Sequence, residues 1–215
     1  MLSNKTLNNL VYDNFFLEQT FNSPTMLLHS KKEIEWLTSF LNLSKTSRIL
    51  DVACGSGRHL KAFVDLGYSH FGLDTSPACI KLAKENCPSV TNQITEIDFL
   101  SFSQNNSEKF DLVFIAGASF GYDPSLAVNL EYLKNLMQLV SASGYLVIQF
   151  LNKSWAKAFV KNKLTFWQEN ENYYTLDKRT LKGDLLISDK IFIKKIVHFK
   201  RIIAILFTCL LKVNF

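Results

Sequence analysis

The sequence predicts an α/β protein with a doubly wound, mostly parallel sheet. Within residues 46–151, five short apolar segments that are typical of buried parallel strands alternate with segments of helical periodicity. The first apolar segment runs into a turn with two glycines, as a strand that feeds a helix would. After residue 152 the alternation gives way to β-rich segments separated by polar turns. This change predicts an antiparallel, β-rich insertion after the fifth strand.

Composition restricts the class of protein. The chain has 215 residues, of which 47% are hydrophobic and 20% charged, so we expect a single globular domain over residues 1–215. Its net charge of +5 comes from scattered lysines, which permit an acidic partner without demanding one. The longest apolar run, residues 202–211, is too short to span a bilayer, so we expect no membrane partner.

The cysteines predict neither a zinc site nor a disulfide framework. They show no CxxC pair and no zinc spacing, and they are Cys54, Cys79, Cys87 and Cys209. We therefore expect reduced, mostly buried thiols in a cytoplasmic protein without a metal site.

Two amphipathic helices are predicted ahead of the first strand. The first places Leu7, Leu10, Val11 and Phe15 on one face, and the second covers about residues 25–41. Because both precede the first strand, we expect residues 1–45 to form a helical lid over the ligand crevice.

Residues 48–60 read RILDVACGSGRHL and predict the start of the ligand site. Asp51 falls at the carboxyl end of a strand, where open α/β sheets bind ligands. Gly55 and Gly57 would let a ligand approach the backbone or allow a positive φ. A plain tight connection between strand and helix would use glycine in the same way, so the turn alone does not separate the two readings.

The same stretch favours one class of ligand over another. A dinucleotide-binding fingerprint needs a third glycine where this chain has Leu60. Asp51, four positions before Gly55, would also repel a pyrophosphate and attract a cation. The stretch therefore favours a positively charged nucleoside without phosphates.

Acidic residues also follow the second and third predicted strands. Asp74 ends the strand at residues 69–74 and lies 17 residues beyond Gly57, a spacing at which a carboxylate can accept both ribose hydroxyls of a nucleoside. Ser76 and Pro77 are typical of the start of a helix. Asp98 follows a third strand at about residues 92–97, and a solvated loop aspartate is its alternative reading.

The fourth and fifth strands complete the predicted core. Residues 110–116 form a nearly continuous apolar strand that opens into the small residues of 117–122. A helix follows, capped by Asp123 and Pro124. Its expected buried stripe is Leu126, Leu130, Leu133, Met137 and Val140. A turn at Ser143 and Gly144 then leads into a fifth strand at residues 145–150.

The ordered set Asp51-x-Ala53-x-Gly55-x-Gly57, Asp74 and Asp98 resembles the motifs of class I S-adenosylmethionine-dependent methyltransferases, which have a Rossmann-like fold. Residues 119–122 (SFGY), 152–155 (NKSW) and 167–169 (WQE) are similar to segments of a small-molecule subgroup. The resemblance implies S-adenosyl-L-methionine as cofactor and a small-molecule methyl acceptor. A DNA adenine methyltransferase would carry Asn/Asp-Pro-Pro-aromatic after the fourth strand, and its absence here argues against a DNA partner.

The resemblance also implies the site residues. The cofactor-binding set is Tyr12, Asp51, Ala53, Gly55, Gly57, Asp74, Thr75, Asp98, Phe99 and Ala116. In the family the tyrosine lies against the cofactor, although Tyr12 is equally well read as a packing aromatic, and the acidic residue at Asp98 bonds the adenine amino group. Ala53 stands where the family often has glycine. The candidates for accepting a proton from the methyl acceptor are Tyr12, Tyr122, Asp123 and His198.

The last third of the chain is predicted to face the substrate. Strands are expected at residues 165–167, 173–176, 185–193 and 195–200, within a cover that spans 152–203. The family usually ends in a sixth strand and an antiparallel seventh beside the fifth, whereas residues 201–215 suffice for one helix or one strand. We therefore expect a truncated or atypical C-terminus at 204–215, and an exposed edge at 144–150 that could form a homodimer.

Three other functions remain open at this stage. An RNA or protein methyltransferase would share the cofactor site. A polyamine synthase would need a carboxylate after the fourth strand, where residues 116–119 supply none. A truncated relic that binds the cofactor, or nothing, is the third.

Overall fold

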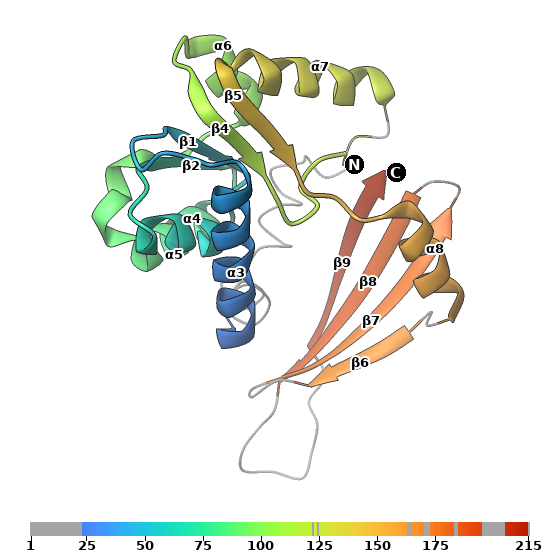
Figure 1. The fold of residues 1–215 in the computed structure, drawn as a ribbon. Coiled ribbons are helices and arrows are strands. Elements are labelled where there is room, and N and C mark those ends of the chain that lie inside the picture. The colour runs from blue at the N-terminus through green and yellow to red at the C-terminus, as the bar shows by residue number, and fades with distance from the viewer. Residues whose placement is uncertain are drawn as a thin grey trace. The chain divides into compact units, whose positions relative to one another are not determined.

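The computed structural model describes residues 23–121, 123, 125–162, 165–169, 173–182, 185–194 and 205–214 (Figure 1). Contacts between residues divide the chain into two compact units. Of the described residues, the first unit holds 23–120 and Leu126–Gln149, and the second holds those in Gly121–Ser125 and Phe150–Phe215.

The first unit contains a five-stranded parallel sheet, as predicted. Its strands are β1 (Ile49–Val52), β2 (His70–Asp74), β3 (Ile94–Glu96), β4 (Phe110–Ile115) and β5 (Val140–Ile148). They lie in the order β3-β2-β1-β4-β5, and every neighbouring pair is parallel. The chain order reverses between β1 and β4, and doubly wound sheets bind their ligands outside the carboxyl ends of the strands at such a switch point.

Helices cover both faces of this sheet. On one face lie α3 (Pro24–Phe40), α4 (Arg58–Asp65) and α5 (Pro77–Asn86), and on the other α6 (Phe99–Asn105) and α7 (Leu126–Gln138) (Figure 1). A short 3₁₀ helix, η1 (Pro88–Gln93), precedes β3. Successive side chains of a strand point to opposite faces of the sheet, so neighbouring residues of β1 pack in different core clusters. Ile49 packs in the cluster that holds Phe63 of α4, whereas Leu50 packs in the cluster that holds Leu136 of α7.

Local signals place the helix starts. Ser23 Oγ accepts the backbone N–H of Met26 at 3.3 Å, and Pro24 follows it, so α3 begins within one residue of the prediction. Ser76 accepts the N–H of Cys79 in the same way at the start of α5. Of the predicted thiols, Cys54, Cys79 and Cys87 are buried and free.

Leu60 occupies the position of the missing third glycine because its neighbour on β2 is a glycine. A Cβ on Gly72 would lie 2.6 Å from Leu60 Cδ1, closer than packed carbon atoms approach. The space that a dinucleotide-binding helix obtains from its own glycine is thus supplied here by the strand.

Two predictions about the end of the core are wrong. Much of the expected stripe of α7 does not face the sheet: Leu126, Leu130 and Met137 are 71%, 47% and 60% exposed, and the fully buried residue of the helix is Leu136. Of the rest of the stripe, Leu133 is half-buried, and Val140, which begins β5, packs against the core. The predicted turn at Ser143 and Gly144 is part of β5, which begins at Val140. A Cβ on Gly144 would lie 2.8 Å from the carbonyl oxygen of Phe110, so the glycine serves close backbone contact at an irregular pairing.

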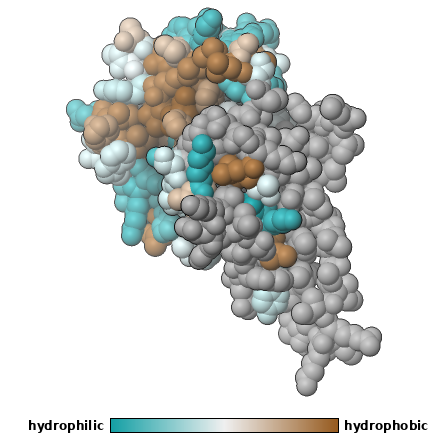
Figure 2. All heavy atoms as spheres, turned by 90° about the vertical axis from the view of Figure 1, so that its right-hand side faces the viewer, coloured by the Kyte–Doolittle hydropathy of each residue, from teal (hydrophilic) through white to brown (hydrophobic). Residues whose placement is uncertain are grey.

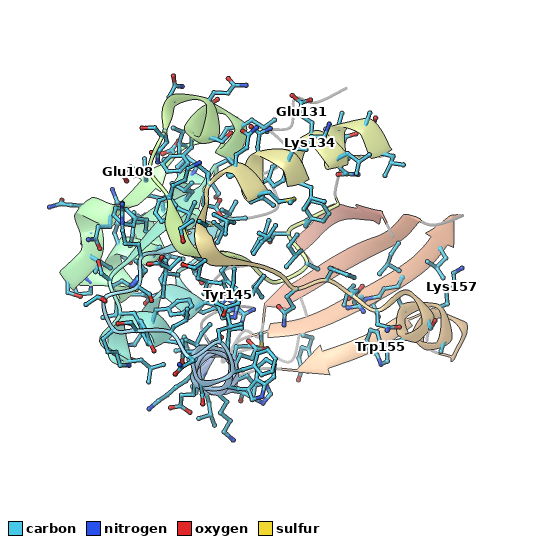
Figure 3. All side chains as sticks on the ribbon, turned by 45° about the horizontal axis from the view of Figure 1, so that its top comes forward. Glu108, Glu131, Lys134, Tyr145, Trp155 and Lys157 are labelled. Carbon is cyan, nitrogen blue, oxygen red and sulfur yellow. The ribbon has the colours of Figure 1, made fainter. Side chains whose placement is uncertain are left out.

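The exposed side of α7 carries both apolar and charged residues. Glu131 and Lys134 point away from the sheet (Figure 3). Hydrophobic residues gather over the upper part of one side of the molecule (Figure 2). Among the described strands, β5 lies at one edge of the parallel sheet, and its residue Tyr145 is 42% exposed.

The second unit contains an antiparallel sheet. The strands of this sheet lie in the order β6 (Thr165–Glu169), β7 (Tyr173–Lys182), β8 (Leu185–Lys194) and β9 (Ile205–Asn214). The unit also contains helix α8 (Lys153–Asn162), which was not predicted from the sequence. The predicted strand at 195–200 lies outside the described residues. Residues 205–214 pair with β8, not with β5. No helix among the described residues is long and apolar enough to cross a membrane.

Candidate functional site

The loop after β1, residues 53–57, is called the glycine loop below. It adopts a left-handed backbone at every second residue. The φ angles are 57° at Ala53, 57° at Gly55 and 80° at Gly57. Ala53, where a glycine is more usual, therefore holds a conformation that is unfavourable for a residue with a Cβ. Gly57 is the N-cap residue that precedes α4, and a Cβ there would lie 3.1 Å from Ala83, so the glycine also lets α4 approach α5.

Asp51 lies beneath this loop with an unsatisfied oxygen. Its residue exposure is 1%, and Oδ2 has no hydrogen-bond partner among the described residues. Burial raises the pKa of this carboxyl to about 8, and the nearby charge of Arg58 only partly opposes the shift. A buried acceptor without a partner is rare in folded proteins, and it indicates a site that a donor, above all a cationic one, would complete.

Asp74 ties the glycine loop to the end of β2. Its Oδ2 accepts the N–H of Gly55 and its Oδ1 accepts the N–H of Ser76, both at 2.9 Å. Burial raises the pKa of Asp74, and the backbone donors from Ser76, Gly55 and Thr75 act against that rise. The carboxylate therefore fixes the loop in place, and Thr75 follows it as an exposed residue.

The next two predicted residues follow β3. Asp98 is exposed and caps α6: its Oδ2 accepts the N–H of Ser101 at 2.9 Å and the Ser101 hydroxyl at 3.0 Å. Phe99 is buried, with its ring centroid 4.6 Å from that of Tyr132. Ala116, directly after β4, is also buried.

Of the four candidate proton acceptors, Asp123 is the one among the described residues. Tyr12, Tyr122 and His198 lie outside the described residues. Asp123 belongs to the second unit, and its Oδ1 accepts the N–H of Ser125 at 2.8 Å, which is a turn-forming contact. The structure thus brings together Asp51, the glycine loop and Asp74.

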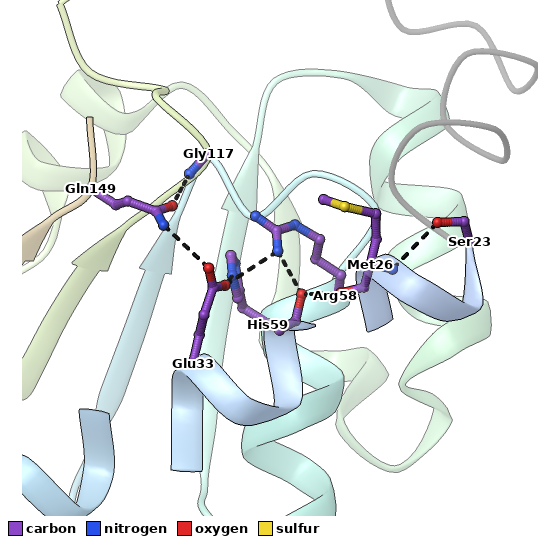
Figure 4. Close-up of polar contacts among 8 residues, drawn as sticks. Ser23, Met26, Glu33, Arg58, His59, Gly117 and Gln149 are labelled. Carbon is purple, nitrogen blue, oxygen red and sulfur yellow. Dashed lines mark hydrogen bonds and ion pairs between the residues drawn. The ribbon is translucent and has the colours of Figure 1, made fainter. Parts of the chain in front are cut away.

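The sequence reading missed a polar group beside the glycine loop. Arg58 is 8% exposed, and its Nη1 lies 2.5 Å from Ser30 Oγ and 3.5 Å from Glu33 Oε2. His59 is also buried, with Nε2 at 3.0 Å from Glu33 Oε2 (Figure 4). The available signal was the pair Arg58-His59 at the start of a short helix, where buried positions are normally apolar.

Through Glu33, the same polar group is also linked to the segments that follow β5 and β4. Gln149, directly after β5, donates from Nε2 to Glu33 Oε1 at 3.4 Å. Its Oε1 accepts the N–H of Gly117 at 2.9 Å (Figure 4). Among the described residues, no group of three or more His, Cys, Asp or Glu is arranged to hold a metal ion.

Comparison with known sequences gives one consistent class. Residues 49–144 match a family model described as a methyltransferase domain. The chain is 31% identical over 130 residues to glycine N-methyltransferase of Mus musculus, which covers 54% of this chain and 44% of the mouse protein. The human enzyme is 29% identical over 132 residues, covering 54% of this chain and 45% of that protein. The chain thus matches less than half the length of these relatives.

Solved structures show the same fold at low identity. A S-adenosylmethionine-dependent methyltransferase from Clostridium acetobutylicum superposes with a TM-score of 0.69 at 15% identity, covering 93% of this chain and 79% of that one. An amino pentose methyltransferase from Micromonospora echinaspora gives 0.67 at 17%, covering 86% and 77%.

The family model spans the glycine loop, Asp74 and all five strands of the parallel sheet as far as Gly144. Its description agrees with the resemblance of the motifs and with the fold of the solved structures. Residues 49–144 therefore match a methyltransferase domain, and the parallel sheet has the fold of solved S-adenosylmethionine-dependent methyltransferases.

Proposed function

We propose that this chain transfers a methyl group from S-adenosyl-L-methionine to a small-molecule acceptor. The observation that carries the proposal is the buried Asp51 Oδ2, which lacks a hydrogen-bond partner beneath a glycine loop. The cofactor is a cationic nucleoside with an ammonium group on its methionine part. An ammonium donor would supply the missing hydrogen bond and favour the ionised form of Asp51.

The other residues of the site fit the remaining parts of the cofactor. Asp74 accepts backbone N–H groups from Gly55, Ser76 and Thr75, and a remaining lone pair of the carboxylate could accept a ribose hydroxyl. Asp98 has used Oδ2 in capping α6, which leaves its Oδ1 for the adenine amino group. Phe99, which follows Asp98 in the chain, and Ala116, which follows β4, are buried and would limit the pocket by packing. Tyr12 remains a candidate to lie against the cofactor.

The cofactor, when bound, supplies a methyl group activated by its sulfonium. The chain has to hold both reactants in line and exclude water, and such alignment can contribute about 7–11 kcal/mol to lowering the barrier. Little covalent chemistry by side chains is then needed. Tyr122, Asp123 and His198 remain candidates for accepting a proton from the acceptor.

We further propose an amine as the acceptor group. The matched relatives are named glycine N-methyltransferases, and one structural neighbour is named an amino pentose methyltransferase. An aliphatic amine with a pKa near 10 must lose its proton before it can attack. At pH 7 this costs about 4 kcal/mol, roughly three pKa units, so desolvation or a nearby base has to assist.

Isothermal titration of S-adenosylhomocysteine, the demethylated cofactor, into the purified chain tests the cofactor site. We expect micromolar binding that is lost in Asp74→Asn, which keeps the size of the side chain but weakens the acceptor of the Gly55 N–H. Asp65→Asn is the matched control, because Asp65 lies on the exposed side of α4 in a surface ion pair with Lys61. No binding by the folded wild-type chain would overturn the proposal.

Turnover is tested with methyl-labelled cofactor and a panel of small amines, with phenols and carboxylic acids as comparison sets. We expect label to appear in one or more amines and not in the other sets. Label found only in phenols or acids would contradict the assignment of an amine while leaving methyl transfer intact.

A further inference from the structure

We propose that Glu33 is a positioning residue that joins helix α3 to both loops of the cofactor site. The inference rests on the proposed function, since it concerns how those loops are held for the cofactor. One oxygen of Glu33 faces α4, which follows the glycine loop, and the other faces Gln149, which holds the turn after β4 (Figure 4). Glu33 thus spans the switch point where β1 and β4 lie side by side.

On the side of the glycine loop, Glu33 is the acceptor for two buried donors. His59 Nε2 lies 3.0 Å and Arg58 Nη1 3.5 Å from the same Oε2 atom. These donors are the first two residues of α4 and directly follow Gly57. A shift of Glu33 would therefore displace the first turn of α4, which directly follows the glycine loop.

Protonation of these groups is consistent with a fixed hydrogen bond. The hydrogen bond from His59 lowers the pKa of Glu33, with burial opposing it, so the carboxylate stays ionised at neutral pH. Burial lowers the pKa of His59 despite the contact with Glu33, so the imidazole is neutral. A neutral ring can donate to Glu33 only with its proton on Nε2, which fixes the tautomer.

On the other side, the contact chain ends at a strained turn. Gly117 and Ala118 have φ angles of 69° and 59°, so the turn after β4 combines two successive left-handed residues. The N–H of Gly117 bonds to Gln149 Oε1, and Gln149 is in turn oriented by its bond to Glu33. Such a turn persists when surrounding contacts hold it, and Glu33 supplies one through Gln149.

Exchanging the two side chains tests this chain of contacts. In Glu33→Gln the carboxylate that orients Arg58 and His59 is lost, and we expect S-adenosylhomocysteine to bind about tenfold more weakly at every pH. In Gln149→Glu two carboxylates face each other where 3.4 Å now separates Gln149 from Glu33. One of them must carry a proton to restore the bond, so affinity relative to wild type should fall about tenfold from pH 6 to pH 8.

The double variant Glu33→Gln, Gln149→Glu restores one carboxylate and one amide in the reverse order. We expect its affinity to return to within about threefold of wild type, with the pH dependence of the wild-type chain. A packing role alone would leave the ratio of Gln149→Glu to wild type independent of pH. Glu35→Gln is the matched control, since Glu35 lies on the same helix with its side chain in an exposed pair with Lys31.

A readout without cofactor separates the failure of this inference from that of the proposed function. The amide of Gly117 should shift in the ¹⁵N spectrum of the unliganded Glu33→Gln and Gln149→Glu chains, and stay in place in Glu35→Gln. An unchanged Gly117 amide in both folded variants would overturn the inference even if wild type binds. If the Gly117 amide shifts but the protein binds no cofactor, the contacts from Glu33 through Gln149 to Gly117 are upheld and the proposed function is rejected instead. If Glu33→Gln does not fold, Gln149→Glu alone decides.

Discussion

In the absence of a ligand, the burial of Asp51 should lower the stability of the folded chain. This loss of stability should grow as the pH rises. The pKa of Asp51 is raised from 3.8 to about 8, chiefly by burial. Between these two values the folded state keeps a proton that the unfolded chain releases. The folded state therefore binds more protons, and the free energy of unfolding falls by about 1.4 kcal/mol for each pH unit that the solution rises through this window.

The variant Asp51→Asn isolates this effect. It removes the titrating group from both states while keeping the shape of the side chain. Relative to wild type, we expect its free energy of unfolding to gain about 3 kcal/mol between pH 5 and pH 7, since each of the two units contributes about 1.4 kcal/mol. The same variant should bind S-adenosylhomocysteine more weakly, so stability and function would change in opposite directions.

Urea unfolding of both proteins at pH 5, 6 and 7, followed by circular dichroism, measures the difference. Asp65→Asn serves as control, because Asp65 is exposed and its surface pair contributes little. Parallel pH profiles for wild type and Asp51→Asn would refute the reasoning, since they would mean that Asp51 ionises in the folded state as it does in the unfolded chain.

Three further predictions follow from backbone geometry and from the sheet edge. Ala53→Gly should raise the free energy of unfolding by about 0.5–1 kcal/mol in a thermal melt, because the relief of a left-handed alanine (φ 57°) exceeds the added freedom of the unfolded chain; a loss would contradict this. Gly57→Ala should lose more stability than Gly67→Ala, since both positions have φ near 80° but only the first Cβ would meet Ala83; equal melting temperatures would exclude packing as the cause. If β5 forms a homodimer, sedimentation should show dimers that Tyr145→Lys converts to monomers, whereas a wild-type monomer at all concentrations would exclude the contact.

Much of the first unit could be predicted because its signals are local. Apolar runs of strand length, Ser76-Pro77 at a helix start and the glycines around Ser56 each act within a few residues of sequence. Asp51 and Asp74 could be placed together because parallel strands end at the same edge of a sheet. Their burial and the hydrogen bond from Gly55 to Asp74 then follow from the fold.

The rest depends on contacts that sequence periodicity does not contain. The four-residue spacing of Leu126 and Leu130 identifies one apolar side of α7, but it does not reveal that the side around Leu136 meets the sheet. Residues 205–214 pair with β8, and a β-prone segment does not name its partner. Glu33 meets His59 across 26 positions and Gln149 across 116, so neither contact leaves a local pattern.

The central claim is that Asp51 and Asp74 form the cofactor site of a methyltransferase. Titration of S-adenosylhomocysteine into wild type, Asp51→Asn, Asp74→Asn and the control Asp65→Asn at pH 7 tests it most directly. The account predicts micromolar binding by wild type and the control, and weak or no binding by the two site variants. Equal binding by all four folded proteins, or binding by none, would contradict it.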